Sequence, residues 1–214
     1  MAPLLQSILT LIAAYLIGSV SGGLVLGRLR GVDIRELGSG SAGGANALRT
    51  QGPAFALWVM LIDVGKGVLA AWLGRKFAPL DGGGSASLGY ATTFAAMFGH
   101  AWPLWHGFRG GRGAAPLIGG LVVMWPWALP MLLVVGAATV LSSGYVGLAT
   151  VLAGLGLPLL AWWSGASAQR AWFAVAAAVL LLVVHRRNLV RMYKGGEARF
   201  ERARLLHRLR RGRQ

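Results

Sequence analysis

The feature that most limits how this chain can fold is a charge-free stretch running from Gly113 to Gln169. It contains no Asp, Glu, Lys, Arg or His. About 20 apolar residues are enough for a helix to cross the hydrocarbon core of a bilayer, so the stretch can supply two or three crossings. The hydrophobic content of the whole chain, 56%, also exceeds the roughly 45–50% that is usual for soluble domains. The sequence therefore predicts an integral membrane protein.

Seven apolar segments are candidate transmembrane helices, and the predicted fold is all-α and polytopic. The segments cover residues 4–27, 53–74, 86–105, 114–128, 129–142, 146–163 and 171–185. The fourth and fifth are short, so one re-entrant hairpin is the alternative to two crossings. No basic residue precedes the first apolar run, which is too long for the apolar part of a signal peptide. We therefore expect this run to remain as the first helix.

The distribution of basic residues predicts the orientation. Most of the 21 lysines and arginines lie in two loops, residues 28–52 and 106–113, and in the tail, residues 186–214. Short loops rich in Lys and Arg stay on the cytoplasmic side, which places the N-terminus outside and the C-terminus in the cytoplasm. Residues 1–185 then form one membrane domain. The net charge of +15 is interpreted as attraction to anionic headgroups rather than to nucleic acid.

The tail after the membrane domain combines arginines with Leu205, Leu206 and Leu209. Such a segment is typical of an amphipathic helix that lies on the headgroups. No soluble domain is expected anywhere in the chain, because the longest polar stretches are this tail and the first loop.

The first loop is suited to anion binding through its backbone. Its glycines permit positive φ and a close approach to a ligand, and successive N–H groups in such a loop form an anion-binding nest. Serine, asparagine and arginine side chains add donors. A flexible connector is the plain alternative. The candidate ligands are Gly38, Ser39, Gly40, Ser41, Asn46 and Arg49, with Gly43 and Gly44 as further positions for positive φ.

The second loop contains two arginines separated by glycines, Arg109-Gly110-Gly111-Arg112, just before a predicted helix. The positive end of that helix favours an anion, so the four residues are predicted to cradle a phosphate. His100, near the end of the third span, is predicted to contact the same anion or move a proton. His106 is interpreted as an interfacial residue.

The third polar region follows the last span. His185, Asn188 and Arg191 have i, i+3, i+6 spacing and share a helical face, and Glu197 is a candidate anchor for nearby arginines. A basic flank that stops translocation is the plain alternative, although it does not require Asn188. Asp63 and Lys66, at i and i+3 inside the second span, are predicted to form a structural ion pair, because unpaired charges there are costly.

The residue types present exclude several chemistries. There is no cysteine, so disulfides and thiolate metal sites are impossible. No Gly-x-Ser-x-Gly elbow and no His-Glu-x-x-His metal motif occurs, and no metal or cofactor is expected. What remains is a site rich in cations and hydrogen-bond donors, which positions and stabilises anionic substrates.

Together, these motifs resemble the bacterial acyl-phosphate:glycerol-3-phosphate acyltransferases, the PlsY family. They occur in the family's order over nearly the whole chain. The matching residues are Tyr15-Leu-Ile-Gly-Ser19, Gly31-Val-Asp-Ile-Arg35, Gly38-Ser-Gly40, Gly43, Asn46, Leu48-Arg-Thr50, Asp63-x-x-Lys-Gly67, Gly99-His100, Pro103, Phe108, Gly110-Gly111, Gly113, His185-Arg186, Asn188, Arg191, Gly195 and Glu197.

The resemblance implies a seven-span enzyme of the bacterial cytoplasmic (inner) membrane. It would move a fatty acyl group from acyl phosphate to the 1-hydroxyl of glycerol 3-phosphate, giving lysophosphatidic acid for phospholipid synthesis. Ser39 and Arg49 would orient substrate, and His100, Asn188 and His185 would hold the reacting groups. A phosphate oxygen is expected to take the hydroxyl proton. We expect a monomer in the lipid bilayer.

The motifs depart from the family pattern at a few positions. Ser41 and Ala45 replace an asparagine and a threonine, Gly147 replaces a serine, and Arg109 and Arg112 replace lysines. Two alternatives therefore stay open: a divergent paralogue acting on another phosphorylated alcohol, and a lipid or organic-anion carrier. No internal repeat of the kind that many carriers contain is found. A receptor or scaffold with a basic tail would leave the first two loops unexplained.

Overall fold

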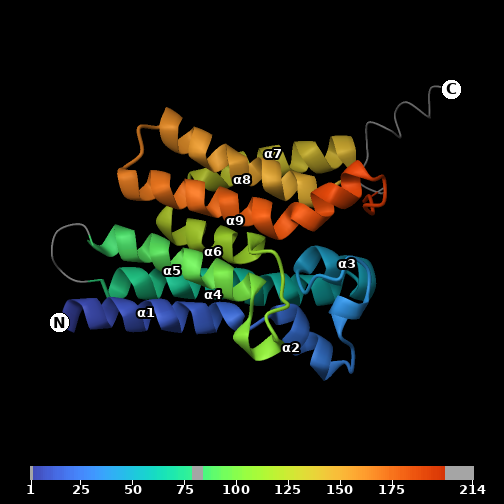
Figure 1. Cartoon of the computed structure of the whole chain (residues 1–214), viewed down its shortest axis with the longest axis horizontal. Helices are drawn as coiled ribbons and strands as arrows, with labels where there is room; N and C mark the ends of the chain where they lie inside the picture. Colours follow the sequence, from blue (N-terminus) through green and yellow to red (C-terminus); the bar gives the residue numbers. More distant parts are fainter. Residues whose placement is uncertain (1, 79–83, 201–214) are drawn as a thin grey trace.

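The computed structural model describes residues 2–78 and 84–200, and within these ranges every regular element is helical (Figure 1). Nine α-helices and two 3₁₀ turns make up this part of the chain. They are α1 (Ala2–Ser19), α2 (Gly22–Leu29), η1 (Ile34–Glu36), α3 (Gly44–Gln51), α4 (Pro53–Lys76), α5 (Gly84–Ala101), η2 (Leu104–His106), α6 (Ala114–Met124), α7 (Ala128–Ser143), α8 (Val146–Trp163) and α9 (Ala168–Tyr193).

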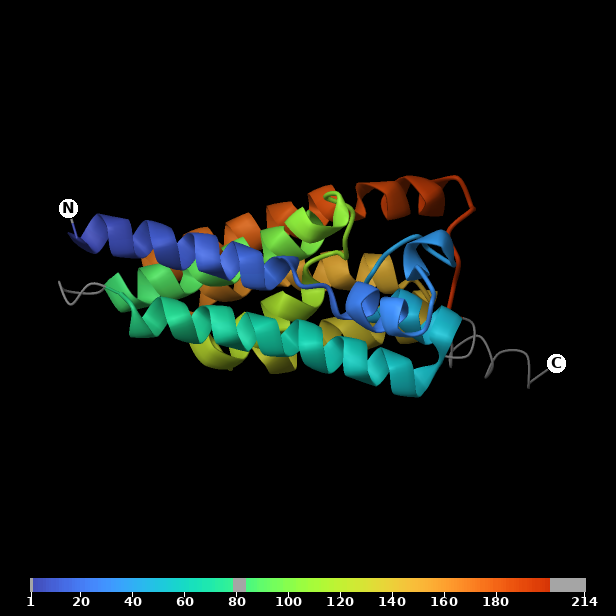
Figure 2. The same ribbon diagram turned by 90° about the horizontal axis from the view of Figure 1, so that it is seen from below.

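The long helices run alternately up and down the long axis of the molecule (Figures 1 and 2). α2, α3, the connection 102–113 and the end of α9 gather at one end, called the polar end below. The N-terminus and the α8–α9 connection lie at the opposite end. Local signals explain several boundaries: Pro53 occupies the first position of α4, where its missing N–H costs nothing, and Gly144 ends α7 with φ +77°, a conformation that favours glycine.

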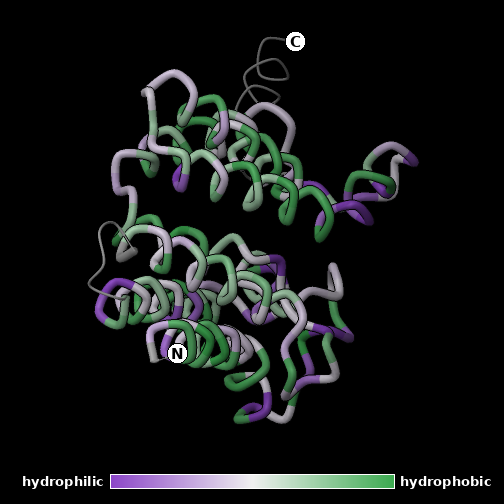
Figure 3. Tube along the Cα trace, turned by 60° about the vertical axis from the view of Figure 1, so that its left-hand side comes forward, coloured by the Kyte–Doolittle hydropathy of each residue, from purple (hydrophilic) through white to green (hydrophobic). Residues whose placement is uncertain are grey.

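The helices form two groups. The first contains α1 to α6, and the second contains α7, α8 and α9; Figure 3 shows the two groups side by side. An apolar cluster joins them, with Leu117 and Leu121 of α6 buried against Leu157 of α8 and Leu181 of α9. The polar end of the molecule therefore has helices of both groups around it.

Glycines let the helices of the first group touch backbone to backbone. A Cβ added to Gly119 of α6 would lie 2.0 Å from the carbonyl oxygen of Val64 in α4, and one added to Gly18 of α1 would lie 2.4 Å from that of Ala96 in α5. Small residues at helix contacts are how membrane helices approach closely. Gly18 therefore serves the packing of α1 against α5.

The helix lengths agree with the predicted spans only in part. α4, α8 and α9 are long and apolar enough to cross a bilayer, and α1 with α2 would make a fourth crossing. The segment 4–27, predicted as one helix, is two helices that meet at 43°. α6 and α7 are shorter than the roughly 20 residues needed to cross. The count of seven crossings and the orientation therefore stay predictions.

Three of the exposed tryptophans lie at the end opposite the polar end, while Trp58 and Trp105 are exposed near the polar end. Trp162 and Trp163, at the end of α8, are 83% and 80% exposed, and Trp172 in the first turns of α9 is 74% exposed. Tryptophan is enriched where a membrane protein meets the headgroups. This exposed set therefore suits contact with a bilayer interface.

Two predicted segment boundaries differ from the structure. The first loop, residues 28–52, contains helix α3, and the last helix continues beyond residue 185 to Tyr193. The basic residues after position 185 therefore begin as a continuation of α9 rather than as a separate tail. Leu205, Leu206 and Leu209, predicted to lie on headgroups, fall outside the described residues.

Candidate active site

A cavity of about 470 Å³ lies at the polar end, between the two helical groups. It brings together side chains from all three polar regions of the sequence, although these are far apart along the chain. The polar side chains in its wall are Ser39, Ser41, Asn46, Asp63, His100, Arg112, Thr150 and His185. Six of the residues predicted to be catalytic or substrate-binding line this cavity, and Asp63 joins them from the buried ion pair. The remaining predicted residues lie around the wall, as follows.

The first loop is held together by Asn46, the second residue after Gly44 in α3. Its amide nitrogen donates to the carbonyl oxygens of Ile34 (2.7 Å) and Ser41 (2.8 Å), and its side-chain oxygen accepts from the backbone N–H of Ser39 at 2.8 Å. These bonds use its hydrogen-bonding capacity within the protein. The geometry therefore favours a loop-organising role for Asn46 over the predicted substrate contact.

The glycines of this loop divide into two kinds. Gly38 and Gly40 have φ values of +58° and +71°, as predicted. Gly43 has a φ of −86° and caps α3, and Gly44 is its first helical residue, so the prediction of positive φ is wrong for these two. Gly44 serves instead by lacking a side chain, because a Cβ there would lie 2.7 Å from the Met60 side chain of α4.

The two arginines of the second loop are placed differently. Arg109 is exposed and does not line the cavity; its carbonyl oxygen accepts a 2.9 Å hydrogen bond from Arg35. Arg112 does line the cavity. Burial lowers the pKa of Arg112 to about 10, the Arg191 and Arg49 cations act in the same direction, and Glu197 opposes them. Its guanidinium stays charged at neutral pH.

Arg35 joins the first loop to the second. It forms an ion pair with Asp33 at 2.6 Å and donates to the carbonyl oxygens of His106 and Arg109. The hydrogen bonds from Arg35 hold the pKa of Asp33 below its usual range. This bridge is not predictable from the sequence, because a local Asp-x-Arg motif does not reveal which distant carbonyl groups the arginine will reach.

Gly110 and Gly111 are placed against His100. Gly111 donates its backbone N–H to the carbonyl oxygen of His100 at 2.9 Å. A Cβ on Gly110 would lie 2.2 Å from that same oxygen, and one on Gly111 would lie 2.0 Å from the Nε2 atom of the His100 ring. These glycines therefore allow the second loop to lie directly on the histidine.

Behind the cavity, Asp63, Lys66 and His100 form a buried trio, 0%, 6% and 2% exposed. The Lys66 nitrogen lies 2.9 Å from the Asp63 Oδ1 and 2.7 Å from the His100 Nδ1. Asp63 Oδ1 also accepts the backbone N–H of Gly22 at 3.1 Å, which joins α2 to α4. The predicted ion pair is confirmed, and the structure adds His100 to it.

The third polar region closes the cavity from the α9 side. His185 lines the wall, and its Nδ1 lies 2.9 Å from the carbonyl oxygen of Leu181. Glu197 accepts hydrogen bonds from Asn188 at 2.5 Å and from Arg191 at 2.7 Å. The anchoring role predicted for Glu197 is thus seen in its contacts, while Asn188 faces the glutamate rather than lining the cavity.

Residues 194–200, called the C-terminal strap here, connect α9 to both helical groups. Ala198 accepts a 3.2 Å hydrogen bond from Arg49 of α3, and Phe200 donates its N–H to the Gly144 carbonyl oxygen at 2.8 Å. Phe200 also lines the cavity. Arg49, predicted to bind substrate, therefore lies at the edge of the cavity and contacts the strap.

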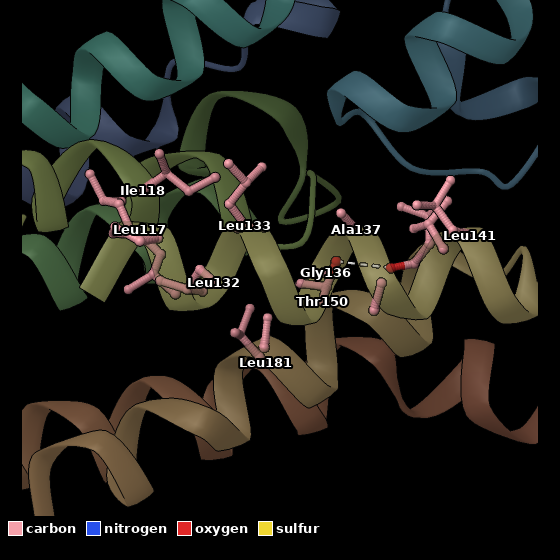
Figure 4. A pocket seen from close by; sticks show the side chains of 16 residues that line it. Leu117, Ile118, Leu132, Leu133, Gly136, Ala137, Leu141, Thr150 and Leu181 are labelled. Carbon is pink, nitrogen blue, oxygen red and sulfur yellow. Dashed lines mark hydrogen bonds between the residues drawn. The ribbon is translucent and has the colours of Figure 1, made fainter. Parts of the chain in front are cut away.

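A second, apolar cavity of about 880 Å³ adjoins the polar one (Figure 4). Leucine, isoleucine and other apolar side chains of α6, α7 and α8 surround it, together with Leu181 of α9. Leu133 in its wall is 71% exposed, so the cavity opens to the side of the molecule. The residues shared by both cavities are Ala114, Ile118, Val140, Val146 and Thr150.

The paired cavities suit an amphiphilic ligand. The Arg112 cation and several hydrogen-bond donors line the polar part, which fits an anionic head, and the adjoining apolar part fits a hydrocarbon chain. The apolar part cannot be located from the sequence, because its lining residues look like ordinary membrane-helix residues. Among the described residues, no group of three or more His, Asp or Glu side chains is arranged to hold a metal ion.

Comparison with known proteins identifies similar sequences and structures. A family model described as glycerol-3-phosphate acyltransferase matches residues 8–195. The glycerol-3-phosphate acyltransferase of Synechococcus sp. (strain CC9902) is 40% identical over 198 residues, covering 92% of this chain and 96% of that protein. The corresponding enzyme of Symbiobacterium thermophilum is 38% identical over 188 residues, covering 88% and 92%.

Two solved structures are also similar to this chain. One is a crystal structure of PlsY (YgiH), an integral membrane glycerol 3-phosphate acyltransferase, in its glycerol 3-phosphate form. It matches with a TM-score of 0.83 at 30% identity and covers 91% of this chain and 95% of its own. The lysophosphatidic acid form of the same protein gives a TM-score of 0.80, also at 30% identity.

Proposed function

This chain belongs to the glycerol-3-phosphate acyltransferase family, and we propose that it takes the acyl group from an acyl phosphate. It is a multi-pass membrane protein that acylates glycerol 3-phosphate. The observation that carries the choice of donor is the pair of adjoining cavities. A polar cavity lined by Arg112 and histidines opens into an apolar one, which is the form needed for a phosphate joined to a long chain.

The proposed reaction forms an ester bond between the 1-hydroxyl oxygen of glycerol 3-phosphate and the acyl carbon. The bond from that carbon to the phosphate oxygen breaks, and inorganic phosphate leaves with the electron pair. The hydroxyl proton passes to a phosphate oxygen, because no residue among those lining the polar cavity stands out as a strong base. The products are lysophosphatidic acid and phosphate.

The protein contributes mainly position and charge. Arg112 balances phosphate charge inside a partly buried site, where such stabilisation is worth far more than in water. Ser39 and Ser41 offer hydroxyl donors from the first loop, and His185 and His100 approach from the two helical groups. Bringing two anionic substrates together in one geometry is itself a large part of catalysis.

The acyl chain is proposed to lie in the apolar cavity between α6, α7 and α8. Each methylene group removed from water contributes about 0.8 kcal/mol, so a cavity of this size favours a long chain strongly. Entry is proposed from the side, next to Leu133. The headgroup phosphate then reaches the polar cavity through the wall that the two cavities share.

For the membrane, we propose seven crossings with the polar end in the cytoplasm of a bacterial cell, at its inner membrane. The alternating directions of the long helices and the basic loops at the polar end support this arrangement. The protein is proposed to act as a monomer, because both cavities are formed within one chain.

The donor is tested with purified protein in detergent, labelled glycerol 3-phosphate, and one of three donors: palmitoyl phosphate, palmitoyl-CoA or palmitoyl-acyl carrier protein. We expect labelled lysophosphatidic acid with palmitoyl phosphate alone, and at least 100-fold less with the other two. Equal rates with a thioester donor would overturn the choice of donor. Adding other phosphorylated alcohols as competitors tests the divergent-paralogue alternative, which requires one of them to react faster than glycerol 3-phosphate.

A further inference from the structure

The buried trio behind the polar cavity fixes more than the position of His100. We infer that Lys66 sets the tautomer of His100, so that this histidine presents an Nε2–H donor to a substrate phosphate and does not act as a base. Lys66 is then a positioning residue for the reaction. The identity of the acceptor rests on the proposed function, whereas the tautomer itself does not.

The three hydrogen-bond partners of the Lys66 nitrogen show whether His100 Nδ1 carries a proton. It lies 2.8 Å from the carbonyl oxygen of Val20, 2.9 Å from Asp63 Oδ1 and 2.7 Å from His100 Nδ1. An ammonium group has three N–H donors and no acceptor. Each donor therefore has one partner, and His100 Nδ1 must be the acceptor of the third. An imidazole nitrogen that accepts a hydrogen bond carries no proton.

The opposite assignment has poorer geometry. It would place a proton on Nδ1 and direct it at Asp63 Oδ1, which is 3.5 Å away, beyond the 2.7–3.2 Å of ordinary N–H···O bonds. It would also require Lys66 to be neutral so that its nitrogen could accept. A neutral Lys66 would leave the fully buried Asp63 carboxylate without its counter-ion, which is strongly unfavourable.

The protonation of Nδ1 determines that of Nε2, the other nitrogen of the His100 ring. With Nδ1 unprotonated, neutral His100 carries its proton on Nε2. That atom faces Gly111, where an added Cβ would lie only 2.0 Å away, and the ring lines the polar cavity. Within residues 2–78 and 84–200, Nε2 has no hydrogen-bond partner. Any side chain at position 111 would cover Nε2, so a phosphate oxygen in the polar cavity can reach Nε2–H only because this residue is glycine.

With this tautomer, His100 cannot accept a proton during the reaction. Nδ1 is occupied by Lys66, and Nε2 already holds a proton, so His100 has no free site to take the hydroxyl proton. A second proton on the ring would also place a cation 2.7 Å from the Lys66 ammonium. His100 therefore stabilises phosphate charge as a hydrogen-bond donor, and the hydroxyl proton goes to a phosphate oxygen.

The direct test is nitrogen NMR of protein labelled with ¹⁵N-histidine, in detergent and without substrate. The chain has four histidines, and the His100 signals are assigned by their loss in His100→Gln. We expect an unprotonated Nδ1 and a protonated Nε2 at neutral pH. A protonated Nδ1 on His100, in either the neutral or the cationic ring, would overturn the inference without the need for any Lys66 variant.

Lys66→Met then tests the role of the lysine. Removing the ammonium should move the proton from Nε2 to Nδ1, toward Asp63, and lower kcat at least tenfold with a smaller change in KM. If this variant does not fold because Asp63 is left unpaired, Asp63→Asn combined with Lys66→Met removes both charges and allows the same measurement. A His100 spectrum identical to wild type in the folded variant would show that Lys66 does not set the tautomer.

The activities of two His100 variants distinguish a hydrogen-bond donor from a general base at this position. A glutamine amide can place an N–H near the position of Nε2, whereas alanine cannot. We expect His100→Gln to retain at least ten times the kcat/KM of His100→Ala; equal losses would contradict the donor role. Wild-type protein inactive with palmitoyl phosphate would overturn the proposed donor, yet the NMR result would still decide the tautomer.

Discussion

The two helical groups differ in how closely their helices approach. In the first group, Gly18 and Gly119 bring helices into backbone contact, and a buried ion pair joins α2, α4 and α5. In the second, α7 and α8 contain no charged residue, and Gly136 of α7 has open space around it. Glycines of the group that holds the ionised trio thus meet the backbone of a neighbouring helix, while those of the group bordering the apolar cavity meet side chains, as Gly154 does, or open space.

The largest expected effect comes from removing a cation from the polar cavity. Arg112→Ala should lower kcat/KM about 100- to 1,000-fold, the usual loss when one charge-stabilising donor is deleted from an active site. Arg109→Ala is the matched control, because the same residue type three positions earlier is exposed and outside the cavity. Steady-state rates with palmitoyl phosphate measure both variants. Similar losses of kcat/KM would show that an arginine need not line the cavity to support activity.

Replacing a glycine by alanine, which adds one methyl group, tests the difference in packing between the two helical groups. Gly119→Ala should destabilise the protein by about 1–3 kcal/mol, the usual cost of overpacking, because the added Cβ meets backbone atoms of α4. Gly136→Ala on α7 is the control, and we expect no loss because nothing lies within 4 Å of its Cβ. Thermal unfolding in detergent measures both. Equal melting temperatures would remove the distinction between the two groups.

Filling the apolar cavity should change the preferred chain length. Ala137 and Ala138 of α7 are both exposed, but only Ala137 lines this cavity. Ala137→Phe should raise the KM for palmitoyl phosphate roughly tenfold, through about 1.4 kcal/mol of lost chain burial, with less effect on a short-chain acyl phosphate. Ala138→Phe should leave both values close to wild type. If the change in KM were the same for long and short acyl chains, the acyl group would have to bind outside this cavity.

The smallest expected effect lies in the strap that links the two groups. Glu197→Gln keeps a side-chain amide for Asn188 but removes the charge paired with Arg191, whose side chain is 40% exposed. Partly exposed ion pairs are worth about 1 kcal/mol or less, so kcat/KM should fall only a few-fold. Glu36→Gln, at an exposed position, serves as the control. A loss as large as that of Arg112→Ala would make Glu197 a member of the site itself.

The sequence predicted which polar regions would meet, and less well what each side chain would do there. Ser39, His100, Arg112 and His185 share one cavity because loop order and helix direction place their segments at one end. Periodicity cannot separate Arg109 from Arg112, since both lie in an irregular loop whose path is set by Arg35. The folded chain directs Asn46 inward through bonds to Ile34 and Ser41, which are contacts no local pattern reveals.

Apolar residues were the other source of error. A run of leucines, valines and alanines predicts burial in lipid or protein, but it does not show whether neighbouring helices will close against each other. The cavity between α6, α7 and α8 is therefore invisible in the sequence. The sequence does not reveal the bend between α1 and α2 for a similar reason, because residues 4–27 contain no charged residue and the break at Val20 and Ser21 does not interrupt the run.

The wall shared by the two cavities has a consequence for how hydrocarbon would travel. A lipid-like donor that enters beside Leu133 keeps its tail among helices while its head lies at the polar end, the same direction that lipids take within one leaflet. Lifting a dozen methylene groups into water would cost about 10 kcal/mol, at roughly 0.8 kcal/mol each. Substrate and product can thus be exchanged by lateral diffusion, with the fatty tail kept dry from arrival to departure.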